Sequence, residues 1–284
     1  MASSVALSII IPTHKRPKVL ARCLEHIEQQ TVGHQLEVIV VADGPDEEAK
    51  RVVGALHATP MKFLEIPKSQ QGIARNKGVE HARGKYVLFI GDDIFLAPHA
   101  CEKHLYHLCH FCDVCPLVLG FTTWDPAAGI TPVMRWLETS GWQFGYGMIA
   151  RYAHGEVPKE LQHKFTYTSH ISLPTEIAKK FPFREDVTRY GWEDIEWGWR
   201  LKEANIPLFY EPDARALHHH RITLEQSLRR MEILGESAVA MEQRVPELTL
   251  VPRGFRRLKY KIAALLPGMR GSHTRAFLRG VNGN

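Results

Sequence analysis

The chain has 284 residues, of which 44% are hydrophobic and 24% charged, and a net charge of +5. These values are ordinary for a soluble globular protein with one large domain, or one domain and a tail. No apolar run approaches the ~20 residues that span a bilayer, and residues 1–4 lack the layout of a signal peptide. Five cysteines, an odd number, fit free thiols in a reducing compartment. We therefore expect a cytoplasmic protein.

Strands and helices are predicted to alternate through the first ninety residues. Strands are expected at residues 5–11, 36–41, 61–66 and 85–90, with helices between them. This alternation predicts a parallel sheet with helices on both faces. Three strands then deliver polar loops to one edge of the sheet, at Thr13 to Arg16, at Asp43 and at Asp92 with Asp93. This is a nucleotide-binding layout, and it lacks both a dinucleotide fingerprint and a P-loop.

Residues 85–95 are the most informative stretch. An apolar run from Tyr86 to Ile90 leads into Gly91 and two adjacent carboxylates, Asp92 and Asp93. Such a run predicts a strand buried on both faces, and ligands bind beyond the carboxyl ends of such strands. Adjacent carboxylates repel each other, and the usual reason to keep them is a divalent cation. Gly-Asp-Asp is also good turn chemistry, so this stretch alone leaves both interpretations open.

Four short motifs in this half of the chain resemble a GT-A fold glycosyltransferase of family 2. They occupy residues 8–13, 40–44, 72–78 and 89–93. The resemblance implies a nucleotide-sugar donor, with Asp43 at the base, Arg75 near the diphosphate and ribose, and Asp93 on a metal. Gly91 stands where the family usually has the first Asp of its Asp-x-Asp motif. Asp92 is the candidate for the ribose contact that this residue would make.

The implied donor site has a physical rationale. A diphosphate leaving group gains negative charge as the glycosidic bond breaks, and a divalent cation stabilises that charge. Arg75, near the start of a predicted helix, adds positive charge beside backbone N–H donors. Taken alone, Arg75 would be a solvated helix residue. The donor-side residues expected from the resemblance are Pro12, Thr13, Arg16, Asp43, Gly72, Arg75, Asn76 and Asp92.

Residues 98–119 are expected to form a helix followed by a fifth strand. The stretch 101–115 contains several Cys and His residues. They are compressed into one helix, whereas a structural zinc site usually uses two ligand pairs with a longer spacer, so zinc is the weaker interpretation. All six Trp residues lie between positions 124 and 199. Core packing is the better interpretation for most of them.

Residues 190–201 carry a second acidic motif. Glu193 and Asp194 lie in the first turn of a predicted helix, where acidic side chains are common as caps. The run from Gly191 to Asp194 also resembles the acceptor-side motif of inverting GT-A enzymes. The resemblance implies that Asp194 is the catalytic base and that Glu193 holds acceptor hydroxyls. Trp192 would form a wall of the acceptor site.

Three consecutive histidines follow a short strand predicted at residues 208–210. In the family, a His that closes the last strand is often the second metal ligand of the protein, and His218 fits this position. A surface run of histidines is the alternative. Carboxylate and imidazole ligands together favour Mn²⁺, with Mg²⁺ as the other candidate.

The C-terminal region is predicted to be helical and basic. A charged amphipathic helix is expected over residues 223–244, and residues 251–284 contain eight Lys or Arg and no Asp or Glu. Basic and apolar residues mixed in this way are typical of a helix on a membrane surface. A packed or solvated helix is an equal alternative. We do not expect nucleic acid as a partner, because no binding motif accompanies the basic tail.

These observations predict an α/β protein with a GT-A domain over residues 1–220 and a helical basic extension over 221–284. Residues 1–120 would bind the nucleotide sugar and 121–220 the acceptor. The expected reaction is metal-dependent inverting transfer from a nucleoside diphosphate sugar, with a UDP-sugar favoured, to a hydroxyl of a glycan or lipid-linked acceptor. Contact with the inner face of a membrane would suit such an acceptor. The alternatives are a sugar-nucleotide pyrophosphorylase and an inactive nucleotide-sugar-binding or membrane-adaptor protein.

Overall fold

The computed structural model describes residues 5–56, 58–187 and 190–283, so the residues expected to lack a signal peptide, 1–4, lie outside it. The strands are β1 (Leu7–Thr13), β2 (Leu36–Asp43), β3 (Met61–Ile66), β4 (Tyr86–Ile90), β5 (Ile94–Leu96), β6 (Leu117–Trp124), β7 (Gly155–Glu156), β8 (His170–Pro174) and β9 (Leu208–His218). The helices are α1 (Pro17–Glu28), α2 (Glu47–Gly54), α3 (Gln71–His81), α4 (Ala100–His110), α5 (Pro132–Thr139), α6 (Lys159–Gln162), α7 (Thr175–Lys180), α8 (Glu193–Glu203), α9 (Leu224–Arg244), α10 (Gly254–Leu265) and α11 (Gly268–Asn282).

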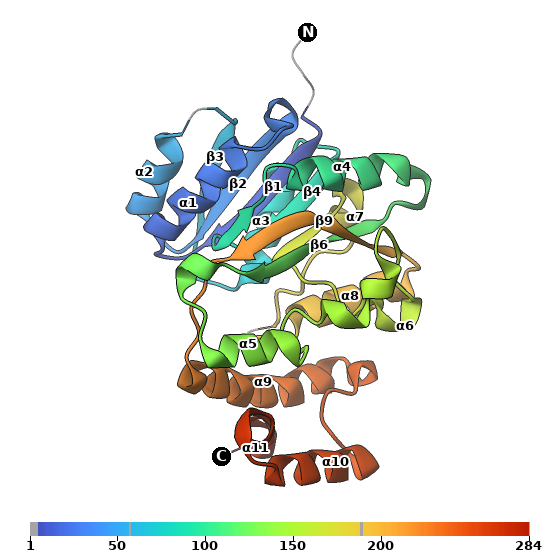
Figure 1. Cartoon of the computed structure of the whole chain (residues 1–284). Coiled ribbons are helices and arrows are strands. Elements are labelled where there is room, and N and C mark those ends of the chain that lie inside the picture. Colours follow the sequence, from blue (N-terminus) through green and yellow to red (C-terminus); the bar gives the residue numbers. More distant parts are fainter. Residues whose placement is uncertain (1–4, 57, 188–189, 284) are drawn as a thin grey trace.

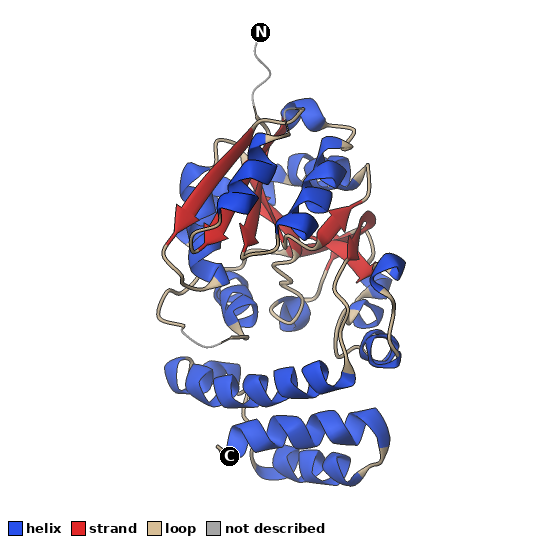
Figure 2. Cartoon of the chain, turned by 90° about the vertical axis from the view of Figure 1, so that its left-hand side faces the viewer, coloured by secondary structure: helices blue, strands red, loops and turns tan. Residues whose placement is uncertain are grey.

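In the described part of the chain, one sheet forms the centre of the molecule (Figure 1). Its strand order is β3-β2-β1-β4-β8-β6-β9-β5, and β7 pairs with β9. Helices α1, α2 and α4 contribute to the core on one face, and α3, α7 and α8 contribute on the other. Helices α9, α10 and α11 lie together at the end of the molecule away from the sheet (Figure 2). This is the α/β architecture with a helical C-terminal region that the sequence predicts.

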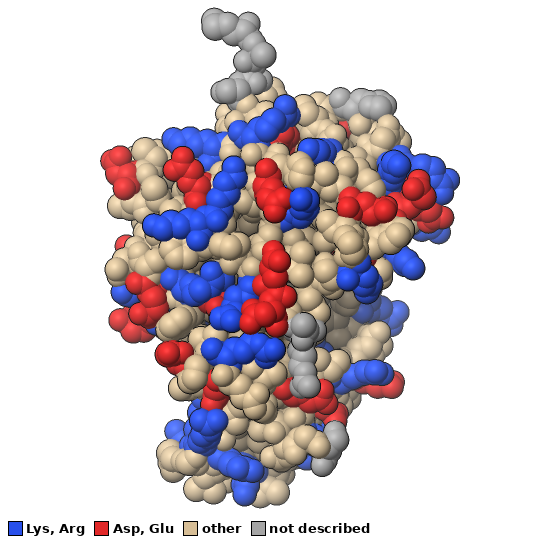
Figure 3. Space-filling model, turned by 180° about the vertical axis from the view of Figure 1, so that it is seen from behind, with Lys and Arg blue, Asp and Glu red and all other residues tan. Residues whose placement is uncertain are grey.

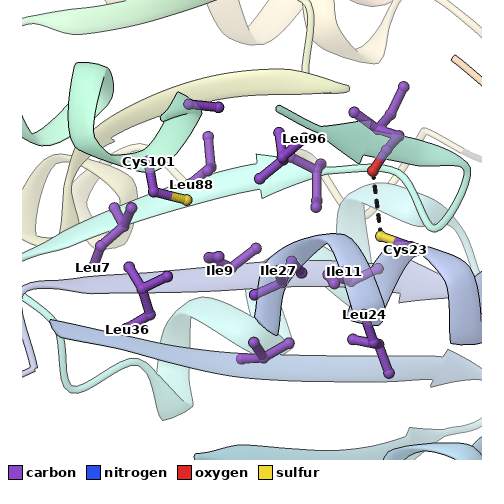
Figure 4. Close-up of a cluster of buried hydrophobic side chains, with 14 of the residues drawn as sticks. Leu7, Ile9, Ile11, Cys23, Leu24, Ile27, Leu36, Leu88, Leu96 and Cys101 are labelled. Carbon is purple, nitrogen blue, oxygen red and sulfur yellow. Dashed lines mark hydrogen bonds between the residues drawn. The ribbon is translucent and has the colours of Figure 1, made fainter. Parts of the chain in front are cut away.

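The first four strands pair in parallel, as the alternating pattern predicts. Every residue of β1 is buried, because helices cover both faces of this strand. On one face, Ile9 and Ile11 meet Leu24 and Ile27 of α1 in the main core cluster (Figure 4). The Cys23 thiol donates to the carbonyl oxygen of Ile94 at 3.3 Å, which ties α1 to the segment after β4. All five cysteines are free, as expected.

On the other face, α3 crosses β1 at close range. A Cβ atom at Gly78 would collide with the side chain of Ile10. The glycine therefore lets the backbone of α3 approach the sheet, and α3 carries Arg75 toward the sheet edge.

The second half of the sheet is mixed. Strand β8 is antiparallel to its neighbours β4 and β6, and β9 is parallel to β6 but antiparallel to β5. The strand expected at residues 208–210 extends to His218, because β6, β5 and β7 all provide pairing partners for β9. The pairing of β9 with β6 shifts register, because Gly120 of β6 pairs with Glu211 and the next residue, Phe121, pairs with Arg215. Polar residues at this bulge hid the second half of the strand from the apolar pattern.

The C-terminal helices pack on the rest of the protein. Helix α11 crosses α9 so closely that a Cβ atom at Gly280 would fall on the carbonyl oxygen of Glu232. One apolar cluster joins this region to the chain before α8, with Val187, Ala238, Met241, Val245, Leu250 and Phe277 buried and Trp192 and Trp199 packed against them. Among the described helices, none combines the length and apolarity required to cross a membrane.

Candidate active site

Two carboxylates directly after β4 form the centre of the candidate site. Asp92 is fully buried, accepts a hydrogen bond from Thr13 Oγ1 at 2.7 Å and forms an ion pair with Arg16. Burial raises the pKa of Asp92 to about 6 against the charge of Arg16, and the charge of Asp93 adds to the increase. The Asp92 carboxylate thus holds Thr13 and Arg16 in place.

Asp93 Oδ2 lies at the meeting point of three side chains. Arg16 Nη1 is 2.9 Å away, His220 Nδ1 is 3.4 Å away and His218 Nε2 is 3.5 Å away. Burial opposes ionisation of this carboxyl, but hydrogen bonds from His218 and His220 hold the pKa of Asp93 well below its usual range. Asp93 is therefore a carboxylate at neutral pH.

Asp93, His218 and His220 fit a divalent cation. Their ligand atoms lie within 4.8 Å of one another. Two ligands about 2.1 Å from one ion lie about 3.0 Å apart at a right angle and about 3.4 Å apart at a tetrahedral angle. The 3.4 and 3.5 Å separations from Asp93 lie at, or 0.1 Å beyond, the tetrahedral value. One carboxylate and two imidazoles favour Mn²⁺ over Mg²⁺.

The pairing of β5 with β9 explains why these residues meet. Ile94 pairs with His218, so the end of β9 lies beside Asp93. The His219 N–H donates to the Asp93 carbonyl oxygen at 2.8 Å, while the His219 ring points elsewhere, 2.6 Å from Asp125 Oδ2. Side chains alternate along an extended chain, which sends His218 and His220 to the same side. Sequence reasoning missed His220, although its two-residue spacing from His218 was the available signal.

Asp43, at the end of β2, joins three loops into one wall. Its Oδ1 accepts hydrogen bonds from the Ser69 N–H at 2.5 Å and from Ser69 Oγ at 3.3 Å. His14 Nδ1 lies 2.7 Å from the Asp43 carbonyl oxygen, and Lys68 Nζ lies 2.8 Å from His14 Nε2. The half-buried Asp43 carboxylate is therefore held in one orientation at the carboxyl edge of the sheet.

Arg75 is a buried cation with unused hydrogen-bond donors. Its side chain is 4% exposed, and Nη2 donates to Gln71 Oε1 at 3.2 Å. Its Nε and Nη1 have no partner among the described residues. Burial lowers the pKa of Arg75, against the charges of Glu193 and Asp194. Buried donors are normally satisfied, so this guanidinium is arranged to bind an anionic ligand.

Gly72 and Asn76 on the same helix hold Phe183 beneath Arg75. The Asn76 amide donates to the Phe183 carbonyl oxygen at 2.9 Å and accepts the Phe183 N–H at 2.8 Å. A Cβ atom at Gly72 would lie 3.0 Å from Phe183 Cβ. The Arg75 guanidinium lies 5.5 Å from the Phe183 ring centre. Of the remaining expected contacts, Pro12 is buried in β1 and pairs with Val41.

Asp194 is the second residue of α8. Its Oδ1 accepts the Ile195 N–H at 2.9 Å, and its carbonyl oxygen accepts a hydrogen bond from Thr166 Oγ1 at 2.8 Å. Burial, followed by the charge of Glu193, raises the pKa of Asp194 to about 7, while Arg75 acts in the opposite direction. Glu193 Oε2 is buried without a partner among the described residues. A carboxyl poised near neutral pH is suited to general-base chemistry.

Helix α9 holds the turn that leads into α8. Trp192 Nε1 donates to the Leu234 carbonyl oxygen at 2.9 Å. Gly191 has φ +93°, and a Cβ atom there would collide with the Leu234 side chain. Trp192 itself adopts φ +71°, a conformation that L-residues rarely hold without support. The C-terminal region thus fixes the motif that contains Asp194.

A cavity of about 610 Å³ opens beside this motif, between α8 and the C-terminal helices. Its aromatic lining consists of Trp142, Trp192, Trp199, Tyr260 and Phe277. Lys164, Lys202 and Arg256 add positive charge. Ile195, next to Asp194, also lines the cavity. Its volume suits a ligand of small-molecule size.

A second His and Glu group lies away from these residues. His107 Nε2 is 2.5 Å from Glu211 Oε2, and His154 Nδ1 is 3.2 Å from Glu211 Oε1. His107 was one of the histidines that suggested zinc, and its partners come from distant parts of the chain. Cys109 and Cys112 are exposed free thiols.

Comparison with known proteins finds a family model and several similar glycosyltransferases. Residues 8–126 match the model of glycosyl transferase family 2. The pre-mycofactocin glycosyltransferase of Mycobacterium tuberculosis is 27% identical over 251 residues, which cover 86% of this chain and 49% of that protein. An uncharacterized glycosyltransferase of Haemophilus influenzae is 36% identical over 101 residues, 35% of this chain and 33% of that protein. The chain thus spans half or less of the length of these relatives.

Solved structures share the fold at low sequence identity. A mannosyltransferase of Pyrobaculum calidifontis, determined with GDP-Man and Mn²⁺, is similar at TM-score 0.59 and 14% identity, covering 98% of this chain and 75% of that one. TarS of S. aureus, determined with UDP-GlcNAc, is similar at TM-score 0.54 and 16% identity, covering 82% and 66%. The chain therefore has the GT-A glycosyltransferase fold, and its residues 8–126 match glycosyl transferase family 2.

Proposed function

We propose that this chain is a metal-dependent inverting glycosyltransferase. It takes a sugar from a nucleoside diphosphate sugar, with a UDP-sugar favoured, and transfers it to a hydroxyl of a glycan or lipid-linked acceptor. The proposed place of action is the cytoplasm, with residues 251–284 near the inner face of a membrane.

Arg75 is the observation that carries this proposal. It is buried on the proposed donor side of the site, and its two unpartnered nitrogens, Nε and Nη1, suit a diphosphate. It also interacts electrostatically with Glu193 and Asp194, although these residues lie on another helix more than a hundred positions later. One side chain thereby links the expected donor site to the expected acceptor site.

The proposed roles follow from this geometry. Asp43 contacts the nucleoside base, and Arg75 binds the diphosphate. Asp93, His218 and His220 would hold a divalent cation, which when bound stabilises negative charge on the leaving diphosphate. Arg16 is held by Asp92 and also pairs with Asp93, so its positive charge lies beside the proposed cation site.

Asp194 acts on the acceptor. Its carboxylate takes the proton of an acceptor hydroxyl as the hydroxyl oxygen forms a bond to the anomeric carbon. The bond between that carbon and the diphosphate oxygen breaks, and the electron pair leaves with the nucleoside diphosphate. Attack from the side opposite the leaving group inverts the anomeric configuration. Trp192 and the cavity behind it hold the acceptor.

The test is a panel of UDP-, GDP- and dTDP-sugars incubated with purified protein and Mn²⁺. We expect release of nucleoside diphosphate from one class of donor, with water as the acceptor, and loss of this release in excess chelator. The release should fall sharply in Asp194→Asn, which removes the proposed base. It should be unchanged in the matched control Asp113→Asn, which alters an exposed carboxylate. A protein that binds a donor but releases no product in any combination would instead be an inactive nucleotide-sugar-binding protein, and the proposal would fail.

A further inference from the structure

Helix α10 turns its apolar side toward solvent. Phe255, Leu258, Ile262 and Leu265 are 72%, 51%, 55% and 84% exposed, and no residue of α10 is buried. At about 100° per residue these four side chains fall within an arc of about 80°. A helix on the surface of a globular protein normally turns such a stripe inward. We call these four residues the α10 stripe.

Contacts on the opposite side of the helix fix this orientation. The Tyr260 ring lies 5.8 Å from the Phe277 ring of α11. Arg256 Nη2 donates to the Leu250 carbonyl oxygen at 2.8 Å, and Arg256 Nη1 bonds to the Thr249 carbonyl oxygen. Tyr260 and Arg256 also line the cavity beside Trp192. One side of α10 therefore forms a wall of that cavity while the other side is the exposed stripe.

Basic side chains frame the stripe. Lys259 and Lys261 project about 40° beyond its two edges. Neither has a carboxylate partner among the described residues, whereas Arg253 pairs with Glu242 and Arg279 with Glu232. On the face seen in Figure 3, the described atoms at the lower tip of the molecule are basic or uncharged. Lysines flanking an apolar stripe match the charged headgroups and acyl boundary of an anionic bilayer.

We propose that α10 docks this protein on the surface of an anionic lipid bilayer, with the α10 stripe inserted at the headgroup level and Lys259 and Lys261 against the lipid phosphates. The proposed membrane contact involves α10 and not all of residues 251–284, because α11 is packed against α9. Docking itself does not depend on glycosyl transfer. Its consequence for the substrate rests on the proposed function: a cavity walled by α10 would receive its acceptor from the membrane.

The test is sedimentation of the full chain with vesicles of phosphatidylcholine, with and without phosphatidylglycerol. We expect binding only to vesicles that contain phosphatidylglycerol. The triple variant Leu258→Ser, Ile262→Ser, Leu265→Ser should bind at least tenfold more weakly. Lys259→Gln and Lys261→Gln should each weaken binding about fivefold and reduce its dependence on salt.

Matched controls alter exposed apolar and basic residues elsewhere. Val114→Ser with Leu224→Ser, and Lys50→Gln with Lys62→Gln, should bind like the parent protein. Hydrolysis of the donor without vesicles should be unchanged in the stripe variant, which separates a failure of docking from a failure of the proposed function. Equal binding of the parent and the stripe variant, or no vesicle binding, would overturn the proposal. Self-association that the stripe variant abolishes, without vesicle binding, would assign this face to a second copy of the chain.

Discussion

Replacing Asp194 with Asn tests the proposed base most sharply. The substitution keeps the size of the side chain and its hydrogen bond from the Ile195 N–H but removes the proton acceptor. General-base catalysis contributes about 10²- to 10⁴-fold, so we expect donor turnover to fall by this factor. The affinity for the donor should hardly change, because Asp43 and Arg75 are intact. Steady-state hydrolysis and calorimetric titration of the donor measure the two quantities separately.

The pH dependence gives an independent test of the same residue. A base with a pKa of about 7 must lose its proton to act, so turnover should rise with pH and increase about tenfold between pH 6 and 8. Glu193→Gln removes a negative neighbour that raises the pKa of Asp194. The increase in turnover should therefore move to lower pH in this variant. Asp113→Asn, the exposed control, should keep the parent profile.

Stability should respond in a defined direction. Folding raises the pKa of Asp194 from 3.8 to about 7, so its contribution to stability is intact below pH 3.8 and is lost as the pH rises through 7. This difference corresponds to about 4 kcal/mol, and partial solvation of the half-buried carboxyl reduces it to about 1–3 kcal/mol. Asp194→Asn should consequently raise the free energy of unfolding at pH 8 and leave it nearly unchanged at pH 4. A variant with parental turnover and no gain in stability at pH 8 would refute the assignment of Asp194.

Three further predictions concern the metal, the diphosphate and the fold. Excess chelator should abolish donor turnover, and Mn²⁺ should restore it. His220→Ala should raise the Mn²⁺ concentration required for turnover about tenfold or more. His219→Ala should leave that concentration unchanged, because the His219 ring contacts Asp125. Full turnover in chelator would contradict the metal site. Arg75→Met should weaken binding of the nucleoside diphosphate about 10- to 100-fold in calorimetry, through loss of charge-assisted hydrogen bonds, and unchanged affinity would remove Arg75 from the site. Gly78→Ala should lower the free energy of unfolding in urea by about 1–3 kcal/mol, because the added Cβ atom collides with Ile10. Gly33→Ala should have little effect, because the space around Gly33 is open. Equal losses in the two variants would show that the close approach of α3 is unimportant.

The first half of the fold was predictable because its signals are local. Strands β1, β2 and β4 are largely apolar runs, and polar residues lie at or just after the end of each. Position at a strand end was therefore enough to bring Asp43 and Asp93 to the same side of the sheet. His218 was instead expected from the family resemblance, and the strand that carries it was predicted eight residues too short.

The remaining features depend on contacts between distant residues. The contacts of Asp92 with Thr13 and Arg16 arise only when β1 and β4 pair, so the sequence could not show them. The hydrogen bond from Trp192 to Leu234 joins residues 42 positions apart, so the dependence of the acceptor motif on α9 was invisible in the sequence. The amphipathic pattern of α10 was visible. The pattern alone does not determine which side of the helix packs against the protein, and in α10 the apolar side is exposed.

The most direct test of the proposed donor site is a calorimetric titration of the purified protein with UDP, GDP and dTDP in the presence of Mn²⁺. We predict saturable binding of one of these nucleotides at a single site, with UDP favoured. Binding should weaken in Asp43→Ala, in Arg75→Met and in Asp93→Asn, and should persist in Asp194→Asn. If no nucleoside diphosphate bound, or if the Asp43 and Arg75 variants bound as tightly as the parent protein, the donor site would not lie at this edge of the sheet.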